Sequence, residues 1–549
     1  MAIRPSLIRV TLVLLCFGAL ALAQFVPHFD DRLQVALSDT LVDPLAVFNP
    51  VEHSGPASPY FIAPSQDGIP YEIPDGCTVD QAAYLVRHGD RYPEPGSFAG
   101  WQQLFAKFQN SSYTARGPLA FIPFWVPPID DLPHEPLFLD STGAGDAFAL
   151  GVRLRKRYGL TPGGANISVW AANQQRSVDT ATYFTRGYLS QGNYLNNTNL
   201  NRGTVITLAD SPSDSGFADT VTPSASCPAY AGPSAAGGNN SNLFRTTYQN
   251  ATAARLNFYL DGLVLNATDV GVMQDLCAWS SEISGDLRFC KAFTPDEWRN
   301  YEYAADLNYY YGSGPANPLS ATSGWPWVKA VTDLFGVGPG KTVANGTLTP
   351  PPLMMMFSHD NNVPPILAAL GVWNSSVTLP GQPETIYPLP VFNREDDPAR
   401  KFRSTYIVNF LGNIALERMT CTVNAPTAEQ QRLAGVVHQA NVLGGKLNLG
   451  ASGNMSQPMN QTFVRFRTNE APVALPNCTS GPGQTCPLDQ FTQMVNGPLQ
   501  AVAGDFVQRC GLQGVPGATS VMKFLTTAGD GQSMLIGVAG TPMGPAVVP

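Results

Sequence analysis

The stretch AAYLVRHGDRYP, residues 82–93, decides the fold. Its apolar start, Ala82 to Val86, predicts a β-strand, and Arg87-His88-Gly89 predicts a tight turn where that strand ends. Arg87 and Arg91 flank His88 on its two sides. Because the planar guanidinium fork matches the oxygens of a phosphate group, and glycine lets the backbone approach closely, this turn is a candidate phosphate pocket.

The histidine and the acids of this turn each allow two interpretations. Flanking guanidinium groups disfavour the protonated imidazole, so His88 is predicted to stay neutral and nucleophilic in mildly acidic solution. An isolated RHG tripeptide is also compatible with a solvated loop around a packed histidine. Asp90 and Glu94 either weaken the binding of highly anionic substrates or are simply solvated loop acids, and the second interpretation is favoured.

The pattern of strand, polar tip and helix recurs at two more places. In open α/β sheets ligands bind outside the carboxyl ends of the strands, so we expect the tips at His88, Arg176 and His359 to converge on one site. The two further segments are Ile167 to Ala172 followed by a helix over Arg176 to Leu189, and Leu353 to Phe357 followed by Ser358-His359-Asp360 and a helix from Pro364 to Leu370.

The composition excludes one class of partner. Of the 549 residues only 13% are charged, and 32 basic against 41 acidic residues give a net charge of −9. Binding to the phosphates of DNA or RNA depends on an excess of Lys and Arg, so this balance argues against a nucleic-acid ligand. The length exceeds the roughly 250–300 residues at which a single core stops growing, which predicts two domains.

The N-terminus predicts export. Arg4 and Arg9 precede and border an apolar run, Val10 to Ala19, and Ala21-Leu22-Ala23 is typical of a signal-peptide cleavage site. The run is shorter than the ~20 residues that a membrane-spanning helix needs. We therefore expect a secreted, extracellular protein with no membrane association after cleavage of residues 1–23.

Cysteines and glycosylation motifs agree with export. After removal of Cys16 with the signal peptide, eight cysteines remain, an even set that fits disulfides, and sequence alone leaves their pairing open. No spacing typical of a zinc site occurs, so no metal is expected. Eleven asparagines begin glycosylation motifs: Asn110, Asn166, Asn196, Asn239, Asn250, Asn266, Asn345, Asn374, Asn454, Asn460 and Asn477.

The fold is predicted to be α/β: a large α/β domain with a central sheet flanked by helices, plus a smaller, mainly helical cap domain inserted in the middle. The Pro-punctuated segment after the signal peptide is predicted to be an extended arm. Within the middle region, residues 250–265 are predicted to be helical. Residues 406–417 and 462–475 alternate as β-strands do, the second stretch with a turn near Asn469-Glu470. The boundaries are a signal peptide at 1–23, an N-terminal arm at 24–76, a discontinuous α/β domain at 77–200 and 350–510, a cap at 201–349 and a C-terminal tail at 511–549.

The pattern RHGxRxP at the end of a strand, with a downstream HD at the end of another, resembles the histidine acid phosphatases. This branch of the histidine phosphatase superfamily includes the fungal phytases and low-pH acid phosphatases. The resemblance extends from Cys77 through Gly511. Further matching stretches are DLNYYY at 306–311, ERMTC at 417–421 and the segment 478–488.

The resemblance implies a role for each tip residue. His88 becomes a phosphohistidine, and Asp360 protonates the leaving alkoxide and then helps to activate water. The phosphoryl oxygens are bound by Arg87, Arg91, Arg176 and His359. These roles suit phosphoryl transfer, which depends on positioning and on neutralisation of developing charge. Arg176 is matched through a looser segment, 170–176, in which relatives often carry another Arg at the position of Trp170.

The resemblance further implies hydrolysis of phosphate monoesters in acid without metal or cofactor, phytate being an expected substrate. Cap residues would select the substrate, and the N-terminal arm would reach a neighbouring subunit of a homo-oligomer. It implies the disulfides Cys77–Cys421, Cys227–Cys510, Cys277–Cys290 and Cys478–Cys486.

Two alternatives stay open. One is phosphomutase-type transfer, since intracellular mutases of the superfamily also use an RHG histidine, although secretion and the HD pair count against it. The other is a non-catalytic secreted glycoprotein. We expect the remaining histidines outside these motifs, His28, His53, His134 and His438, to be surface or packed residues. Met354-Met355-Met356 is expected to fill a core, and the tyrosine run at 301–311 to pack the smaller domain.

Overall fold

The computed structural model describes residues 48–129, 131, 133–159, 167–189, 203–210, 216–373, 400–424 and 458–527, and the short strands 533–536 and 545–546. The predicted signal peptide and the arm up to residue 47 lie outside the described residues. From Pro50 on, the chain forms one compact unit. The division into an α/β domain and a cap stays a prediction.

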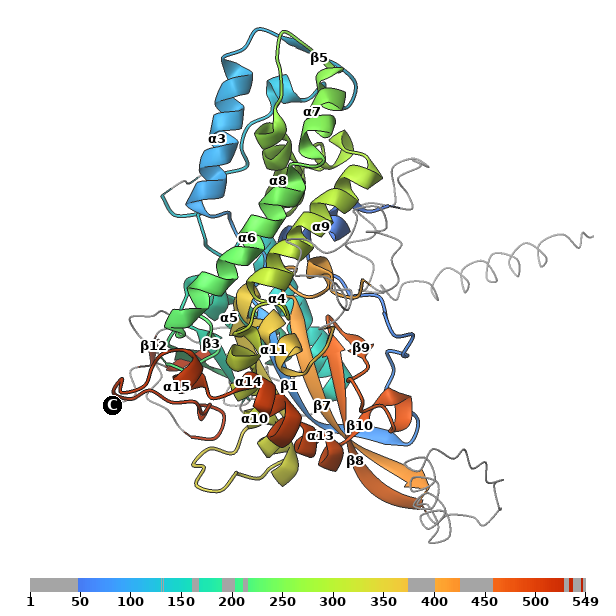
Figure 1. Cartoon of the computed structure of the whole chain (residues 1–549), viewed down its shortest axis with the longest axis vertical. Coiled ribbons are helices and arrows are strands. Elements are labelled where there is room, and N and C mark those ends of the chain that lie inside the picture. Colours follow the sequence, from blue (N-terminus) through green and yellow to red (C-terminus); the bar gives the residue numbers. More distant parts are fainter. Residues whose placement is uncertain are drawn as a thin grey trace, which may run out of the picture. The chain divides into compact units, whose positions relative to one another are not determined.

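A mixed β-sheet forms the centre of this unit (Figure 1). Its described strands follow the order β10-β8-β7-β1-β6-β3-β4-β11-β12, with β9 paired to β8. The four neighbours β1, β6, β3 and β4 are parallel, and the strands on either side pair antiparallel. The bounds are β1 Cys77–Arg87, β3 Ile167–Ala172, β4 Gly203–Leu208, β6 Leu353–Ser358, β7 Asn413–Asn424, β8 Pro458–Thr468, β9 Ala471–Val473, β10 Cys486–Pro487, β11 Ser533–Ile536 and β12 Pro545–Ala546.

The methionine run of β6 shows how the strands divide two cores. Successive side chains of a strand point to opposite faces of the sheet. Met354 and Met356 belong to one buried cluster, and Met355 belongs to the cluster on the other face. All three side chains are fully buried, so the expectation that they fill a core is confirmed.

Helices cover both faces of the sheet. Helices α4 (Ser141–Tyr158) and α5 (Gln175–Leu189) pack on the face that contains Met355. Their backbones lie close together at Gly151, where a β-carbon would stand 2.1 Å from the carbonyl oxygen of Phe184. Helices α10 (Ser320–Val337) and α11 (Pro364–Ala369) cover the opposite face. The resulting fold is α/β, as the sequence predicts.

A second group of helices reaches the carboxyl ends of the parallel strands. In this group α6 packs on α9, and α8 packs on α3 and α7 (Figure 1). The bounds are α3 Pro95–Gln109, α6 Ala231–Arg245, α7 Gln249–Asn257, α8 Ala267–Ser284 and α9 Pro295–Gly312, with the small strand pair β2 Thr114–Ala115 and β5 Leu260–Asp261 beside them. The remaining short helices are α13 Leu488–Met494, α14 Gln500–Ala503 and α15 Phe506–Arg509.

Two predicted elements have different bounds in the structure. The helical stretch expected over 250–265 ends at Asn257, because the chain then extends into β5. The strand expected over 406–417 begins only at Asn413. The residues before it cannot be regular strand, since Leu411 has a positive φ of 55° and its amide donates to the carbonyl of His88 at 3.1 Å. This irregular segment therefore supports the turn that holds His88.

All four disulfides implied by the resemblance are present: Cys77–Cys421, Cys227–Cys510, Cys277–Cys290 and Cys478–Cys486. Cys77 and Cys421 stand directly opposite each other on β1 and β7. The strand that leads to His88 is thus covalently joined to the C-terminal part of the sheet.

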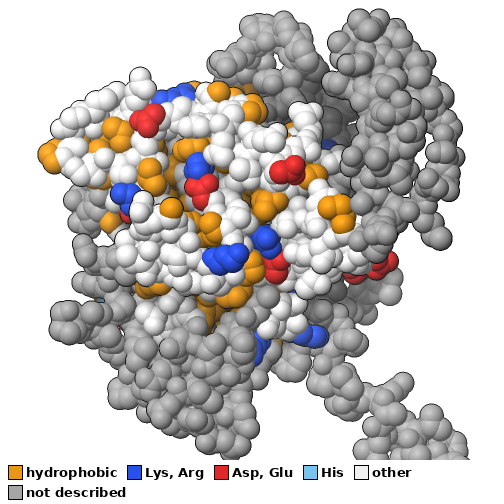
Figure 2. Space-filling view, turned by 90° about the horizontal axis from the view of Figure 1, so that it is seen from below, with side chains coloured by type: hydrophobic (Ala, Val, Ile, Leu, Met, Phe, Trp, Pro, Cys, Tyr) orange, Lys and Arg blue, Asp and Glu red, His pale blue; other side chains and the backbone are white. Residues whose placement is uncertain are grey.

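The described surface agrees with the low content of charged residues. Figure 2 shows charged side chains scattered among uncharged and hydrophobic ones. Seven motif asparagines fall within the described residues and all are exposed: Asn110, Asn239, Asn250, Asn266, Asn345, Asn460 and Asn477. Among the helices that the structure describes, none is long and apolar enough to pass through a bilayer.

Candidate active site

The predicted tips meet at the carboxyl ends of the central parallel strands. His88 follows β1, His359 and Asp360 follow β6, and Arg176 lies in the first turn of the helix after β3. Because β1, β6 and β3 are adjacent and parallel, their carboxyl ends open on the same side. The rings of His88 and His359 have centroids 5.6 Å apart. The structure therefore brings together residues that are more than 270 positions apart in the sequence.

The turn after β1 fixes which nitrogen of His88 carries the proton. Nδ1 lies 2.9 Å from the carbonyl oxygen of Gly89, and a carbonyl can only accept, so Nδ1 is the protonated nitrogen. The lone pair of Nε2 is then available for attack. A glycine is required at 89, because a β-carbon there would stand 2.8 Å from the carbonyl oxygen of Gly143.

The surroundings keep His88 neutral in acid. Its side chain is buried, and burial together with the charges of Arg87, Arg91 and Arg176 holds the pKa of the imidazole well below its usual value. The direction of this shift agrees with the sequence prediction. A neutral imidazole can act as a nucleophile at acidic pH, whereas an imidazolium cannot.

Both arginines of the RHGxR stretch are held in place by their neighbours. Arg87 donates through Nη1 to the carbonyls of Val408, at 2.6 Å, and Pro56. Its guanidinium lies over the ring of Phe410, 4.4 Å from the centroid. Arg91 donates to the carbonyl of Tyr92 at 2.8 Å and lies over the ring of Trp279. Such fixed cations can receive an anion with little reorganisation.

Arg176 is part of the same cationic group. Burial, and the nearby charges of Arg91 and Arg87, lower the pKa of its guanidinium to about 10. Like charges depress a pKa only when they are close, so the three arginines repel one another. A bound anion relieves that repulsion. The looser sequence match at 170–176 thus still leads to a residue at the site.

Asp360 connects the cations with an open space. Its Oδ2 lies 3.3 Å from Nη2 of Arg87 and accepts a hydrogen bond of 2.7 Å from the hydroxyl of Tyr309. Burial favours the neutral acid, but the charge of Arg87 and the bond from Tyr309 outweigh it and lower the pKa of Asp360. The side chain is 26% exposed, so a ligand can reach the carboxyl group.

The fourth parallel strand adds a residue that the sequence reading did not include. Asp210 follows β4, and its Oδ2 lies 3.4 Å from Nε2 of His359. Burial and Arg176 lower the pKa of His359, while the bond to Asp210 opposes this shift. The sequence signal for Asp210 is a strand pattern at 203–208 followed by an acid. These residues fall in the range predicted to be the cap, so the prediction does not place them in the sheet.

The interpretation of the tyrosine run as packing only is wrong at Tyr309. Its hydroxyl donates to Asp360, so this residue belongs to the site. Neighbouring Tyr310 is buried, but in the cluster that covers the central sheet beside α10 rather than in a core of the smaller domain. The reason is helical spacing: successive residues of α9 point in directions about 100° apart, so one faces the site while the next faces the core.

The acids of the first turn also differ from the favoured interpretation. Glu94 is half exposed and pairs with Arg91. Asp90 is fully buried, so it is not a solvated loop acid. Burial and the charges of Glu282, Asp146 and Asp140 hold the pKa of Asp90 well above its ordinary value. These four carboxyl groups form the acid cluster behind the turn.

Comparison with known proteins identifies the family. The sequence model of the histidine phosphatase superfamily (branch 2) matches residues 78–438. The chain belongs to this family. The match includes His88, Arg176 and the 359–360 pair, so the histidine phosphatase region covers the described tips of the parallel strands.

Relatives of this histidine phosphatase include acid phosphatases and phytases. An acid phosphatase of Komagataella pastoris is 27% identical over 482 residues, covering 85% of this chain and 87% of the relative. A phytase of Candida albicans is 26% identical over 476 residues, with the same coverage. Among solved structures, the phytase from D. castellii has a TM-score of 0.67 at 22% identity, covering 89% of this chain and 94% of that one.

These findings confirm the predicted family, the α/β fold class and the enzyme class, a phosphoric monoester hydrolase of the histidine acid phosphatase type. The roles of the individual site residues stay predictions. Two histidines expected outside the site contact carboxylates elsewhere: His53 pairs with Glu302, and His134 with Asp131. His28 and His438 lie outside the described residues.

Proposed function

We propose that this histidine phosphatase is a secreted, metal-independent acid phosphatase that hydrolyses phosphate monoesters, phytate among them, through a phosphohistidine on His88. Asp360 is the proton donor. The phosphoryl oxygens are bound by Arg87, Arg91, Arg176 and His359. One observation supports the proposal: a neutral imidazole, three guanidinium groups and one partly exposed carboxyl group lie together at the carboxyl ends of the parallel strands.

In the first step, Nε2 of His88 forms a bond to phosphorus while the bond to the ester oxygen breaks. The leaving alkoxide is basic and takes a proton from the carboxyl group of Asp360. Burial favours the neutral form of this carboxyl, but the charge of Arg87 opposes that effect and its pKa is lowered. A bound phosphoryl group neutralises Arg87, so substrate binding raises the pKa of Asp360 and favours its protonated form.

In the second step, water attacks the phosphohistidine. Asp360, now a carboxylate, accepts a proton from that water, the bond between Nε2 and phosphorus breaks, and inorganic phosphate leaves. The same carboxyl group therefore acts as acid and then as base. Throughout both steps the fixed guanidinium groups balance the charge that develops on the phosphoryl oxygens.

The decisive experiment combines product analysis with trapping of the intermediate. Purified protein is incubated with phytate and with an aryl phosphate across acidic pH, with EDTA present, and released phosphate is measured. Rapid denaturation with labelled substrate is expected to leave label on His88, as read by mass spectrometry. His88→Ala is expected to lose both the label and the activity.

Three results would overturn the proposal. Full activity of His88→Ala would show that His88 is not the nucleophile. Loss of activity in EDTA would contradict metal independence. Isomerisation of a phosphoglycerate without free phosphate would favour the phosphomutase alternative. Secretion is tested separately by expressing the whole chain in yeast, where the mature protein in the medium is expected to begin at Gln24.

A further inference from the structure

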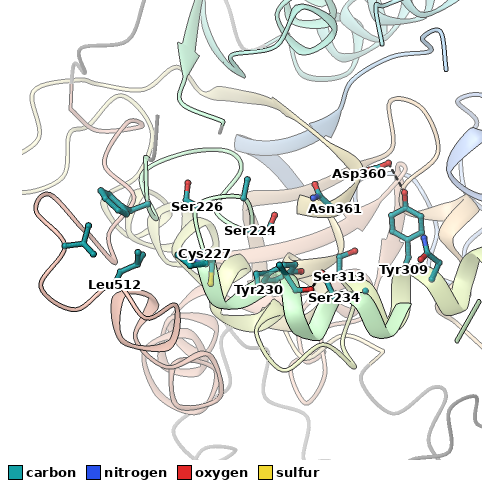
Figure 3. Close-up of a pocket in the computed structure, with 17 residues that line it drawn as sticks. Ser224, Ser226, Cys227, Tyr230, Ser234, Tyr309, Ser313, Asp360, Asn361 and Leu512 are labelled. Carbon is teal, nitrogen blue, oxygen red and sulfur yellow. Dashed lines mark hydrogen bonds between the residues drawn. The ribbon is translucent and has the colours of Figure 1, made fainter. Parts of the chain in front are cut away.

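A cavity of about 860 Å³ opens beside Asp360 (Figure 3). Asp360 and Tyr309 lie at one end of it, and Leu512 lies at the other end. Serines and the ring of Tyr230 occupy the space between. The cavity therefore has a chemically reactive end and a distant end without reactive groups.

The lining differs from a site for a polyanion. Among the described residues that line the cavity, Asp360 is the one that carries a formal charge. The other lining residues are uncharged polar or apolar: Phe217, Ser224, Ala225, Ser226, Cys227, Pro228, Tyr230, Ala231, Ser234, Asn308, Tyr309, Gly312, Ser313, Asn361, Leu512 and Val515.

The position of Asp360 determines what the cavity receives. One side of this carboxyl group contacts Arg87, which is in the phosphate-binding group. Asp360 also lines the cavity. A general acid must touch the oxygen of the leaving group. If the phosphoryl group binds at the arginines, the alcohol part of the ester consequently extends past Asp360 into the cavity.

The far wall is apolar and covalently fixed. Leu512, Val515 and Phe217 line it, and Cys227 of the same lining is joined to Cys510. Cys227, Phe217 and Leu512 also share a hydrophobic cluster. A wall of this kind can bury an aromatic or aliphatic group with little rearrangement.

We propose that this cavity is the binding site for the leaving alcohol and that it selects monoesters of uncharged alcohols with an aromatic or apolar end over phytate. The inference rests on the proposed function, because it needs the phosphoryl group at the arginines. Phytate would bring five further phosphate groups to this space, where the described lining offers no cation and the carboxylate of Asp360 repels them.

The first test compares substrates that differ only beyond the reacting bond. Naphthylethyl phosphate and ethyl phosphate both release a primary alkoxide, so the chemistry of the bond is matched. We expect kcat/KM for naphthylethyl phosphate to exceed that for ethyl phosphate by about tenfold or more, because the naphthyl group is removed from water in the cavity. Phytate is expected to be hydrolysed with a lower kcat/KM than naphthylethyl phosphate.

The second test places a cation in the wall. Ser234 lies on α6, is half-buried, and its hydroxyl donates to the carbonyl of Ala231 at 2.9 Å, within the same helix. Ser234→Lys is expected to raise the ratio of kcat/KM for phytate to kcat/KM for naphthylethyl phosphate by about tenfold. Val521→Lys is the matched control: Val521 is 56% exposed, does not line the cavity, and should leave the ratio unchanged.

The outcomes separate the inference from the proposed function. Equal kcat/KM for the two alkyl esters, or a preference for phytate in the unaltered protein, would overturn the inference while phosphate release continued. An unchanged ratio in Ser234→Lys, with both variants folded by circular dichroism, would do the same. Failure to release phosphate from every ester would instead overturn the proposed function.

Discussion

The three arginines of the site and the cavity beside them meet at Asp360 but have opposite chemistry. Arg87, Arg91 and Arg176 concentrate positive charge on one side, where burial and their mutual repulsion lower the pKa of Arg176. On the other side the described lining is uncharged apart from Asp360 itself. The phosphoryl group is common to every monoester, whereas the alcohol varies. Under the proposed function, the arginine charges therefore act on the phosphoryl group, which is the same in every substrate.

Substitution of Asp360, which lies between the arginines and the cavity, should change turnover more than any single substitution among the arginines or in the cavity wall. Asp360→Asn is expected to lower kcat for alkyl esters by about 10²–10⁴-fold, since an alkoxide leaves poorly without a proton. Nitrophenyl phosphate should lose far less, because nitrophenolate needs no protonation. Steady-state kinetics on both esters measures the difference. An equal loss on the two esters would show that Asp360 is not the acid.

A change on the phosphate side should affect all esters alike. Arg176→Gln is expected to lower kcat/KM by about 10²-fold, because one cation that faces the developing charge is lost. The loss should be the same for ethyl phosphate, naphthylethyl phosphate and phenyl phosphate. Competitive inhibition by inorganic phosphate should weaken in parallel. A loss that depends on the alcohol would place Arg176 on the cavity side instead.

Asp210 is expected to act through His359 as a positioning residue. Its contact opposes the lowering of the pKa of His359, so Asp210→Asn should lower that pKa further. Protonated His359 then persists only at lower pH, and the alkaline limb of the pH profile of kcat/KM should move to lower pH. The expected loss at the optimum is about tenfold. Asp210→Glu should restore part of the activity, whereas an unmoved alkaline limb would refute the role.

Tyr309 should shift the profile in the opposite direction. Its hydrogen bond helps to lower the pKa of Asp360, so Tyr309→Phe is expected to raise that pKa and extend activity to higher pH by up to about one pH unit. Tyr310→Phe is the control, since Tyr310 belongs to the core beside α10. A shift of the profile in the control and not in Tyr309→Phe would contradict the assignment.

The smallest expected effect concerns stability rather than turnover. The pKa values of Asp140 and Asp146 are raised to about 6 and that of Glu282 to about 8, in each case chiefly by burial, and Asp90 is raised as well. Folded-state values above the unfolded ones mean that this stabilisation is present in acid and is lost as pH rises through the folded pKa values.

The melting temperature should therefore fall between about pH 5 and pH 8. The free energy of unfolding should fall over the same range. Because asparagine cannot ionise, Asp90→Asn should lose about 1 kcal/mol less of that free energy than the unaltered protein. Asp296→Asn is the control, because the side chain of Asp296 is 85% exposed. Calorimetry across this range measures both variants, and an identical fall in Asp90→Asn and the unaltered protein would disprove the effect.

Local patterns were sufficient to predict the strands that carry the site. The apolar runs before His88 and His359 indicated β1 and β6, and the alternating residues with a turn at Asn469-Glu470 match β8 and β9. The alternating pattern gave a wrong start for the strand at 406–417. Residues before Asn413 are irregular there, and the amide of Leu411 donates to the carbonyl of His88. Tertiary contacts override periodicity in such a segment, because its backbone hydrogen bonds go to another element.

The sequence by itself determined the family, the strand tips and the direction of the pKa shift of His88, since these depend on residue type and short spacing. The tertiary structure decided which residues join them. Asp210 and Tyr309 reach the site only because β4 lies next to β3 and because α9 ends beside η9 (Asp360–Asn362). Asp90 is charged or neutral according to its burial, which no short motif encodes. Proximity between distant residues, and the desolvation that follows from it, exist only in the folded chain.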